Sequence, residues 1–449
     1  MCEPYLSRRS FVTRGFGAAV VLSGPSGPFH LPTWDELFGL ERPYLEVALK
    51  AWRWIDSTRT RTDHGVTWPA DPNEPDSFGD TLYTHGTGVL PFALELFHTT
   101  QDQQILDVAR TGAEHLVASL EDVSGSGLYV GLGGVAFVLA ETYRATGDIR
   151  YRRAAERAAD VIVERATAVG EGMAWPMSTP DGDVLESNDI VSGTSGAGLS
   201  LLYLAKVLGH SESLSMATRA GDRLMERASR VDEGLRWDMW PGYEREMPNF
   251  SHGTAGVAYF LATLAHDTGR SEYFDAAVQG ARYLQSIATV ENDGYLVFHS
   301  RPGGEDLYYL SWCHGPVGTN RLFYRLHEAT GDQEWMDWMQ MGARGIMGTG
   351  VPERRTAGFW ENVSQCGGTA GLGEFFLAMQ RMTGDNGYGD FVDRLHADLL
   401  KRSTDEGDAL KWTQSEHRVL PELLVAQTGF MQGAAGIGKY FLHIDSMST

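Results

Sequence analysis

Two cysteines stand at matching places in this sequence. Cys313 and Cys366 lie 53 residues apart, each two residues before a glycine that opens a Gly-rich segment, and His314 directly follows the first of them. Two thiolates with one nitrogen donor are a typical zinc-binding set, and three protein ligands leave a fourth coordination position open for a substrate. We therefore predict that Cys313, Cys366 and His314 hold a zinc ion. Two inert buried thiols are the alternative, because cysteine also packs as a small apolar residue.

A histidine and an aspartate occupy similar positions earlier in the chain. His252 precedes Gly253, and Asp189 lies four residues before Gly193. An imidazole exchanges protons near neutral pH, and a carboxylate beside it can orient or recharge it. Their predicted catalytic roles, with His252 as general acid and Asp189 orienting it, are what the family resemblance described below implies. A structural histidine at a helix start and an aspartate that caps a helix are the alternatives.

Glycine-rich segments recur seven times and divide the chain into repeats. In five of them the last glycine lies 13 residues before another glycine, as from Gly256 to Gly269. Thirteen residues at about 1.5 Å each form a helix of roughly 20 Å, which a C-cap glycine ends. We attribute most repeat glycines to close packing of these helices. The seven segments are 85–88, 131–134, 193–196, 253–256, 315–318, 368–371 and 433–436.

A second helical pattern follows each of these helices, so the repeating unit is a helical hairpin. Residues 151–162 are the clearest second helix, with one apolar and one charged face. The seventh apolar helix, from about Gly436, has no partner after it, and the amphipathic segment 43–57 has none of its own. Pairing the two buries both apolar faces. We predict an all-α fold, an α/α toroid (barrel) of about seven helical hairpins closed by its N-terminal and C-terminal helices.

The polar residues named above all stand just ahead of apolar helices, together with His85 and Gln432. A ring therefore brings them to one mouth, where the helix N-termini also meet. Unpaired backbone N–H groups at such ends favour anionic or electron-rich guests. We predict that a peptide or small-molecule substrate binds in this mouth.

The segments around the two cysteines resemble a known family. Residues 311–315 (SWCHG) and 366–371 (CGGTAG) are similar to the two metal-binding stretches of lanthionine synthetase C-like (LanC-like) proteins. His252-Gly253 and Asp189 match the family's proton-handling positions, and the order of these residues agrees over about residues 40 to 449. The resemblance implies a zinc-dependent cyclase that adds a peptide Cys thiol to a dehydroamino acid and so forms a thioether.

The sequence also departs from the family pattern. Gly367 follows the second cysteine, where the family has the histidine that is its third zinc ligand. His314, His85 and His417 are candidates for the missing donor, and no spacing argument selects among them. Tyr309 stands where the family usually has a basic residue, four positions before Cys313.

Composition limits the partners and the compartment. The 449 residues carry a net charge of −22, which argues against nucleic acid, and no run of 18 apolar residues predicts a membrane span. Arg8 and Arg9 precede a weakly apolar stretch, so residues 1–30 read as a twin-arginine export signal or a disordered tail. We expect a single toroid domain over 31–449, in a protein exported by that route or otherwise cytoplasmic.

Two other functions fit the same pattern. Twelve tryptophans and acidic loops also suit a carbohydrate-active α/α toroid, either a hydrolase or an epimerase, although no carboxylate pair is singled out by spacing. A non-catalytic descendant that binds peptides is the third possibility, with the glycine at position 367 as its mark. Bound zinc, bound oligosaccharide or bound peptide distinguishes the three.

Overall fold

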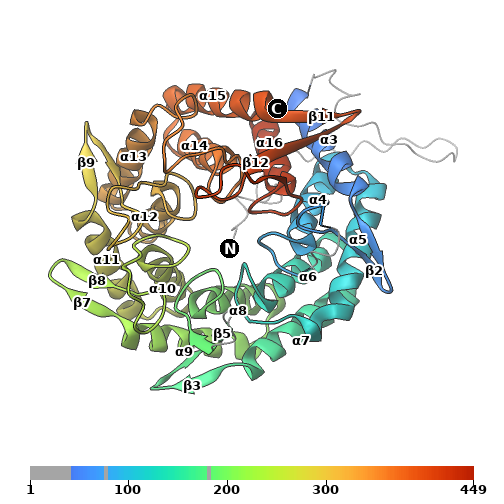
Figure 1. Cartoon of the computed structure of the whole chain (residues 1–449). Helices are drawn as coiled ribbons and strands as arrows, with labels where there is room; N and C mark the ends of the chain where they lie inside the picture. Colours follow the sequence, from blue (N-terminus) through green and yellow to red (C-terminus); the bar gives the residue numbers. More distant parts are fainter. Residues whose placement is uncertain (1–41, 75–78, 179–183, 449) are drawn as a thin grey trace, which may run out of the picture.

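Helical hairpins follow one another around a ring in the computed structural model, which describes residues 42–74, 79–178 and 184–448 (Figure 1). The inner helices are α4 (Gly86–Thr100), α6 (Leu132–Thr146), α8 (Thr194–Leu208), α10 (Thr254–Thr268), α12 (Pro316–Thr330) and α14 (Thr369–Thr383). Their outer partners are α5 (Gln103–Ser119), α7 (Ile149–Glu164), α9 (Ser211–Arg227), α11 (Ser271–Ser286), α13 (Gln333–Gly348) and α15 (Asn386–Arg402). The predicted toroid is confirmed.

The first and last described helices close the ring. Helix α3 (Pro43–Ser57) packs along α16 (Ala434–Ser448), which also contacts the inner helices α4 and α14. Arg42, just before α3, donates from Nε to the carboxylate of Asp445 at 3.2 Å. The pair α3–α16 is therefore the seventh hairpin that the sequence predicts. The export signal or tail predicted for residues 1–30, and the domain start at 31, lie outside the described residues.

A chain of backbone hydrogen bonds runs around the mouth. Each link joins residues that stand two places before an inner helix's N-cap, and each N–H donates to the carbonyl of the next repeat. The last link, from Met431 to Tyr83 at 2.9 Å, returns to the first repeat, and only the step from Val191 to Ser251 lacks such a bond among these described residues. Residues at equivalent sequence positions are thus neighbours in space. The other links are Tyr83 to Tyr129, Tyr129 to Val191, Ser251 to Cys313, Cys313 to Cys366 and Cys366 to Met431.

The repeat glycines serve close packing of two kinds. A Cβ on Gly256, the third residue of α10, would lie 2.0 Å from the carbonyl oxygen of Phe250 in the loop before that helix. The corresponding distance is 2.1 Å from Gly318 to Trp312 and 2.2 Å from Gly371 to Gln365. These glycines let each helix's first turn approach its own preceding loop. Other glycines do lie between inner helices as predicted: a Cβ on Gly133 of α6 would lie 2.4 Å from Oγ of Ser200 on α8, and one on Gly198 of α8 would lie 2.5 Å from the ring of Phe260 on α10.

Short antiparallel hairpins follow the outer helices, and the all-α prediction did not anticipate them. They are β1 (Thr60–Thr62) with β2 (Gly65–Thr67), β3 (Thr167–Val169) with β4 (Gly172–Ala174), β7 (Ser229–Val231) with β8 (Gly234–Arg236), β9 (Thr289–Glu291) with β10 (Gly294–Leu296), and β11 (Ser403–Glu406) with β12 (Ala409–Ser415). A further pair is β5 (Pro176–Ser178) with β6 (Val184–Glu186), and β13 (Leu424–Ala426) adds to β12.

Several tryptophans fasten these hairpins to the outer helices. The indole N–H of Trp175 donates to the carbonyl of Ile162 at 2.7 Å, that of Trp237 to Leu224 at 2.7 Å, and that of Trp412 to Leu399 at 2.8 Å. All three rings are buried. These aromatics therefore belong to the core and are not platforms for a sugar.

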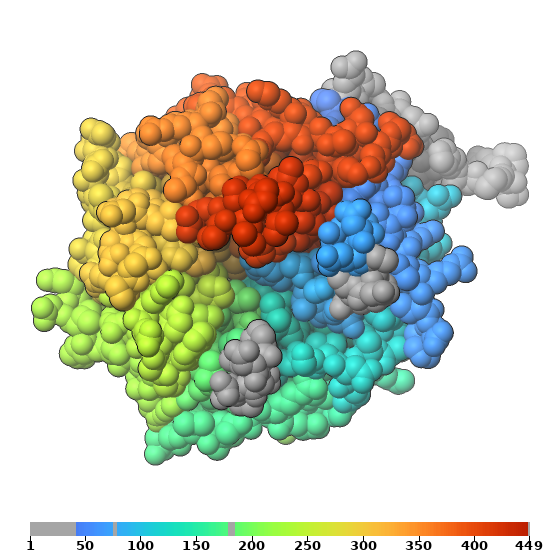
Figure 2. Space-filling model, viewed as in Figure 1, coloured from blue at the N-terminus to red at the C-terminus, as the bar shows by residue number. Residues whose placement is uncertain are grey.

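The connection between β12 and β13 lies beside the mouth. In Figure 2 this red segment covers part of the opening at the centre of the ring. Among the described residues, no helix is long and apolar enough to cross a membrane.

Candidate functional site

The two cysteines lie side by side at the mouth. The N–H of Cys313 donates to the carbonyl of Cys366 at 3.1 Å, and the two thiols are within hydrogen-bonding contact. Both side chains are buried, with relative exposures of 7% and 4%. The contact follows from their equivalent positions, two residues before the N-caps Gly315 and Gly368. Ring geometry therefore joins sulfurs that are far apart in the sequence.

A tyrosine completes this thiol group, and sequence reasoning missed it. The hydroxyl of Tyr83 is 2.7 Å from Sγ of Cys366, and Gln432 donates to the same hydroxyl at 3.3 Å. Tyr83 stands two residues before the N-cap His85, so the position that it shares with the cysteines was a usable signal. We call Tyr83, Cys313 and Cys366 the thiol group.

Cys313 and Tyr83 favour their neutral forms. The hydrogen bond with Cys366 and burial raise the pKa of Cys313 well above its usual value, although the backbone N–H of His314 acts in the opposite direction. Burial and the neighbouring sulfurs likewise raise the pKa of Tyr83. Burial and the contact with Cys366 thus favour the thiol form of Cys313.

The predicted catalytic pair forms a connected dyad. Nδ1 of His252 is 2.7 Å from Oδ2 of Asp189, and Oδ1 of Asp189 accepts the backbone N–H groups of Ser192 and Gly193 at 2.8 and 2.7 Å. The Asp189 side chain is fully buried, whereas the His252 side chain is 28% exposed. The carboxylate thus assigns the proton to Nδ1 and leaves Nε2 as an acceptor. No described residue forms a hydrogen bond with Nε2, which can face a guest.

Two more histidines lie next to the dyad. The ring of His314 is 5.8 Å from that of His252 and stacks on His299 at 4.5 Å with an interplanar angle of 9°. Burial, with Arg418 and Arg245 nearby, lowers the pKa of His299 to about 4. Burial also lowers the pKa of His314 well below its usual value. Both rings are therefore neutral near pH 7. Nothing in the spacing pointed to His299, which lies in the loop before α12.

The donors do not complete a three-ligand zinc centre. Nδ1 of His314 is buried without a hydrogen-bond partner, yet within the described ranges no three His, Cys, Asp or Glu side chains form a group that could hold a metal. His85 instead bonds to Thr81 and Thr84 at 2.9 and 2.7 Å, and His417 lies at the rim. The predicted ligands thus supply two adjacent sulfurs, and His314 is turned toward His299.

Position 367 has room for a side chain. A Cβ on Gly367 would lie 3.4 Å from Nδ2 of Asn362 and 3.6 Å from the ring of Trp360, which are ordinary contact distances. Its backbone is also outside the left-handed region that favours glycine. The backbone at position 367 therefore accepts a Cβ without a close contact.

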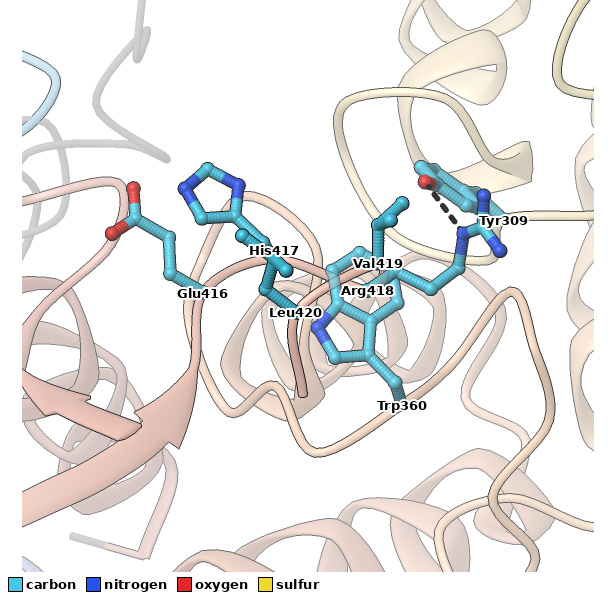
Figure 3. A pocket seen from close by; sticks show the side chains of 7 residues that line it. All are labelled: Tyr309, Trp360, Glu416, His417, Arg418, Val419 and Leu420. Atoms are coloured by element: carbon cyan, nitrogen blue, oxygen red, sulfur yellow. Dashed lines mark hydrogen bonds between the residues drawn. The ribbon is translucent and has the colours of Figure 1, made fainter. Parts of the chain in front are cut away.

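A groove of about 430 Å³ opens on the outer side of the histidines (Figure 3). Tyr309 and Trp360 line it, with ring centroids 5.2 Å apart. Arg418 reaches across from the β12–β13 connection and donates from Nε to the hydroxyl of Tyr309 at 3.4 Å. The guanidinium thus brings positive charge to Tyr309, where the resembling family usually has a basic residue in the chain itself.

Three solved structures illustrate the range of similarity to this chain. Nisin cyclase superposes with a TM-score of 0.59 at 16% identity, covering 90% of this chain and 94% of that chain. An inactive variant of the alpha-1,6-mannanase of Salegentibacter sp. HEL1_6, in complex with alpha-1,6-mannotetrose, gives 0.46 at 13% identity, with 90% and 98% covered. Cellobiose 2-epimerase of Bacillus thermoamylovorans gives 0.48 at 10% identity, with 70% and 90% covered.

The family comparison covers the ring from its first inner helix onward. The family described as lanthionine synthetase C-like protein matches residues 76–449, which include both cysteines and the Asp189–His252 dyad. The similarity to nisin cyclase extends over nearly the whole of both chains. This chain therefore belongs to the lanthionine synthetase C-like protein family.

Proposed function

We propose that this protein is a peptide cyclase that adds a Cys thiol to a dehydroamino acid and so forms a thioether. The Asp189–His252 hydrogen bond of 2.7 Å carries the proposal, because it leaves one imidazole nitrogen free at the mouth to accept and return a proton. Family membership supports the reaction class. The acidic chain, with a net charge of −22, suits a neutral or basic peptide guest.

The reaction is an isomerisation in which one proton moves twice. Nε2 of neutral His252 takes the proton of the substrate thiol, and the sulfur forms a bond to the β-carbon of the dehydroamino acid. The double-bond electrons pass to the carbonyl as an enolate. The imidazolium then returns its proton to the α-carbon, which restores the enzyme. An ordinary thiol has a pKa of about 8.5 and an imidazole about 6.5, so the first transfer costs roughly 3 kcal/mol.

Asp189 makes this transfer easier. Its carboxylate stabilises the imidazolium through Nδ1, and the two backbone N–H groups on its other oxygen hold it in position. Its own side chain is fully buried, so water does not compete for the imidazole. The neighbouring His299 and His314 stay neutral near pH 7, since burial lowers the pKa of both.

The proposed proton steps do not require zinc, and a metal measurement decides whether the protein binds it. The two sulfurs of Cys313 and Cys366 are suitable donors for this metal, whereas the described residues add no third donor to them. None of the proton steps above runs through a metal. Zinc at about one per chain in the purified protein supports a zinc-dependent form of the reaction.

The test is a direct assay for thiol consumption. The purified protein is incubated with a peptide that holds one Cys and one dehydroalanine, and the remaining thiol is labelled with N-ethylmaleimide. We expect a product of unchanged mass that no longer takes the label. His252→Asn abolishes this loss of thiol, whereas the matched control His64→Asn, at an exposed turn, retains it.

Two results contradict the proposal. Thiol loss at the same rate with His252→Asn shows that the dyad does not act in the reaction. Peptide that binds while its thiol persists identifies a non-catalytic peptide-binding protein instead, and selective binding of oligosaccharide supports the carbohydrate-active alternative.

A further inference from the structure

An exposed aliphatic segment overhangs the mouth. We define residues 416–424 as the rim loop, which joins β12 to β13. Four of its side chains are exposed, with relative exposures of 75% for Val419, 44% for Leu420, 50% for Leu423 and 60% for Leu424. The other large exposed apolar side chains of the described residues stand singly on separate elements. Single exposed apolar residues are ordinary, but a contiguous cluster marks an interaction site.

The rim loop separates two hollows of different character. The groove of about 430 Å³ lies on one side, where Val419 and Leu420 face the rings of Tyr309 and Trp360 (Figure 3). Its wall also includes Glu416, His417 and Arg418, of which the first two line both hollows. A second hollow of about 260 Å³ lies on the other side, with the carboxylates of Asp71, Glu74 and Glu416 in its wall. One side therefore suits an apolar group and the other suits a cation.

The groove and the candidate site share one wall residue, Tyr309. Tyr309 forms part of its wall, and the same ring is 5.2 Å from His314 and 4.6 Å from His299. His314 in turn lies 5.8 Å from His252. A chain held in the groove thus has its next residues beside the dyad.

We propose that the rim loop is the docking site for an extended segment of the substrate peptide that carries aliphatic and basic residues. An aliphatic side chain packs between the rim loop and Tyr309–Trp360, and a Lys or Arg lies near Asp71, Glu74 and Glu416. The net charge of −22 supports this choice, because it attracts a basic peptide and repels anionic surfaces. The inference rests on the proposed function, whose substrate class it narrows.

The test measures binding without turnover. His252→Asn is the parent protein, and a fluorescent dehydroalanine peptide that contains Leu and Lys is titrated by anisotropy. The triple variant Val419→Ser, Leu420→Ser, Leu423→Ser weakens binding at least about tenfold, which is about 1.4 kcal/mol and less than the burial of one aliphatic side chain provides. Leu214→Ser, on the outer helix α9, is the matched control with one exposed leucine lost.

Peptide variants test the two hollows separately. Replacing Leu by Ser in the peptide removes the difference between parent and triple variant. Asp71→Asn with Glu74→Gln weakens only the Lys peptide, and this effect fades in high salt. Circular dichroism and thermal unfolding of every variant show that the fold is retained.

Several results overturn the inference. One is a triple variant that binds the peptide as tightly as its parent does. Another is a triple variant whose affinity for the Ser peptide falls as much as its affinity for the Leu peptide. A molar mass by light scattering that doubles in the parent and falls to one chain in the triple variant assigns the rim loop to contact with a second copy. Competition by cellotetraose but not by unlabelled peptide assigns it to a sugar.

The proposed function and this inference fail separately. If the wild-type protein consumes no thiol while the triple variant still loses peptide binding, the cyclase proposal fails and the docking site stands. If the wild-type protein consumes thiol and the triple variant binds normally, the docking site alone fails.

Discussion

The two sides of the mouth differ in the hydrogen-bond partners of their polar side chains. On one side, Asp189 bonds to His252 and to two backbone N–H groups, and the free nitrogen of the imidazole faces outward. On the other side, Cys313 and Cys366 bond to each other and to Tyr83. The dyad has every partner that acid–base chemistry needs, whereas the thiol group is closed on itself. The difference suggests that catalysis depends most on the dyad.

Replacing the carboxylate should have the largest effect. In Asp189→Asn the amide oxygen can keep the N–H bonds of Ser192 and Gly193, and its NH₂ then faces Nδ1 of His252. The imidazole must turn to the other tautomer, which puts its proton on Nε2 and removes the acceptor for the thiol proton. We expect the rate of thiol loss to fall about 10²- to 10⁴-fold with little change in KM. A rate within threefold of wild type contradicts the catalytic role of the dyad.

Substitutions of the repeat glycines test how strongly each side of the mouth depends on the position of its loop. A Cβ on Gly256 overlaps the loop that carries His252, and one on Gly371 overlaps the loop that carries Cys366. We expect Gly256→Ala and Gly371→Ala each to lower the free energy of unfolding by about 1 to 3 kcal/mol. Only Gly256→Ala should also slow thiol loss strongly. Denaturant unfolding and the thiol assay measure the two quantities.

Gly348→Ala is the control for this pair, because a Cβ there meets nothing within 4 Å. Its stability should stay within about 0.5 kcal/mol of wild type. If Gly371→Ala slows the reaction as much as Gly256→Ala does, the two sides contribute equally and the comparison is wrong.

A histidine at position 367 should change the thiol side alone. A Cβ at this position makes only ordinary contacts with Asn362 and Trp360, and an imidazole that reaches the two sulfurs would add a nitrogen donor to them. We expect Gly367→His to retain about one zinc per chain after dialysis and the wild-type protein to retain less. Gly367→Ala is the control for added volume. Equal zinc in all three proteins, measured by elemental analysis, shows that a donor other than residue 367 completes the site or that none does.

The toroid could be predicted because glycines recur at a constant spacing that marks where the inner helices begin and end. Gly269 has φ of 72° and ends α10 where the spacing puts a C-cap, and the partnerless segment 43–57 does pair with the last helix. The short β-hairpins could not be predicted, since three-residue strands such as β7 carry no usable alternation of apolar and polar residues.

The site could be predicted only where it follows the repeat. Cys313 and Cys366 share a repeat position, so their contact could be expected from the sequence. Arg418 and His299 reach the site from irregular connections, and no periodic pattern places such segments in space. The sequence also does not reveal which way a side chain points. His314 follows Cys313 in sequence, but its imidazole stacks on that of His299.

The smallest effect is expected at Tyr83, which closes the thiol group. Tyr83→Phe removes the hydroxyl 2.7 Å from Sγ of Cys366 and leaves Nε2 of Gln432 without that acceptor. One such hydrogen bond contributes about 0.5 to 1.5 kcal/mol to stability, so the unfolding free energy should fall by that amount. Thiol loss should change by no more than about threefold, because the proposed proton path runs through His252.

A half-buried tyrosine whose hydroxyl bonds at an exposed position provides the comparison for this variant. Tyr308→Phe removes a hydroxyl that bonds to Thr289 at 3.1 Å in solvent, and its stability should match wild type. A loss of thiol consumption in Tyr83→Phe as large as that in Asp189→Asn would move the catalytic centre to the thiol side. The sulfurs of this protein would then act in the reaction directly, since Tyr83 contacts Cys366 and no member of the dyad.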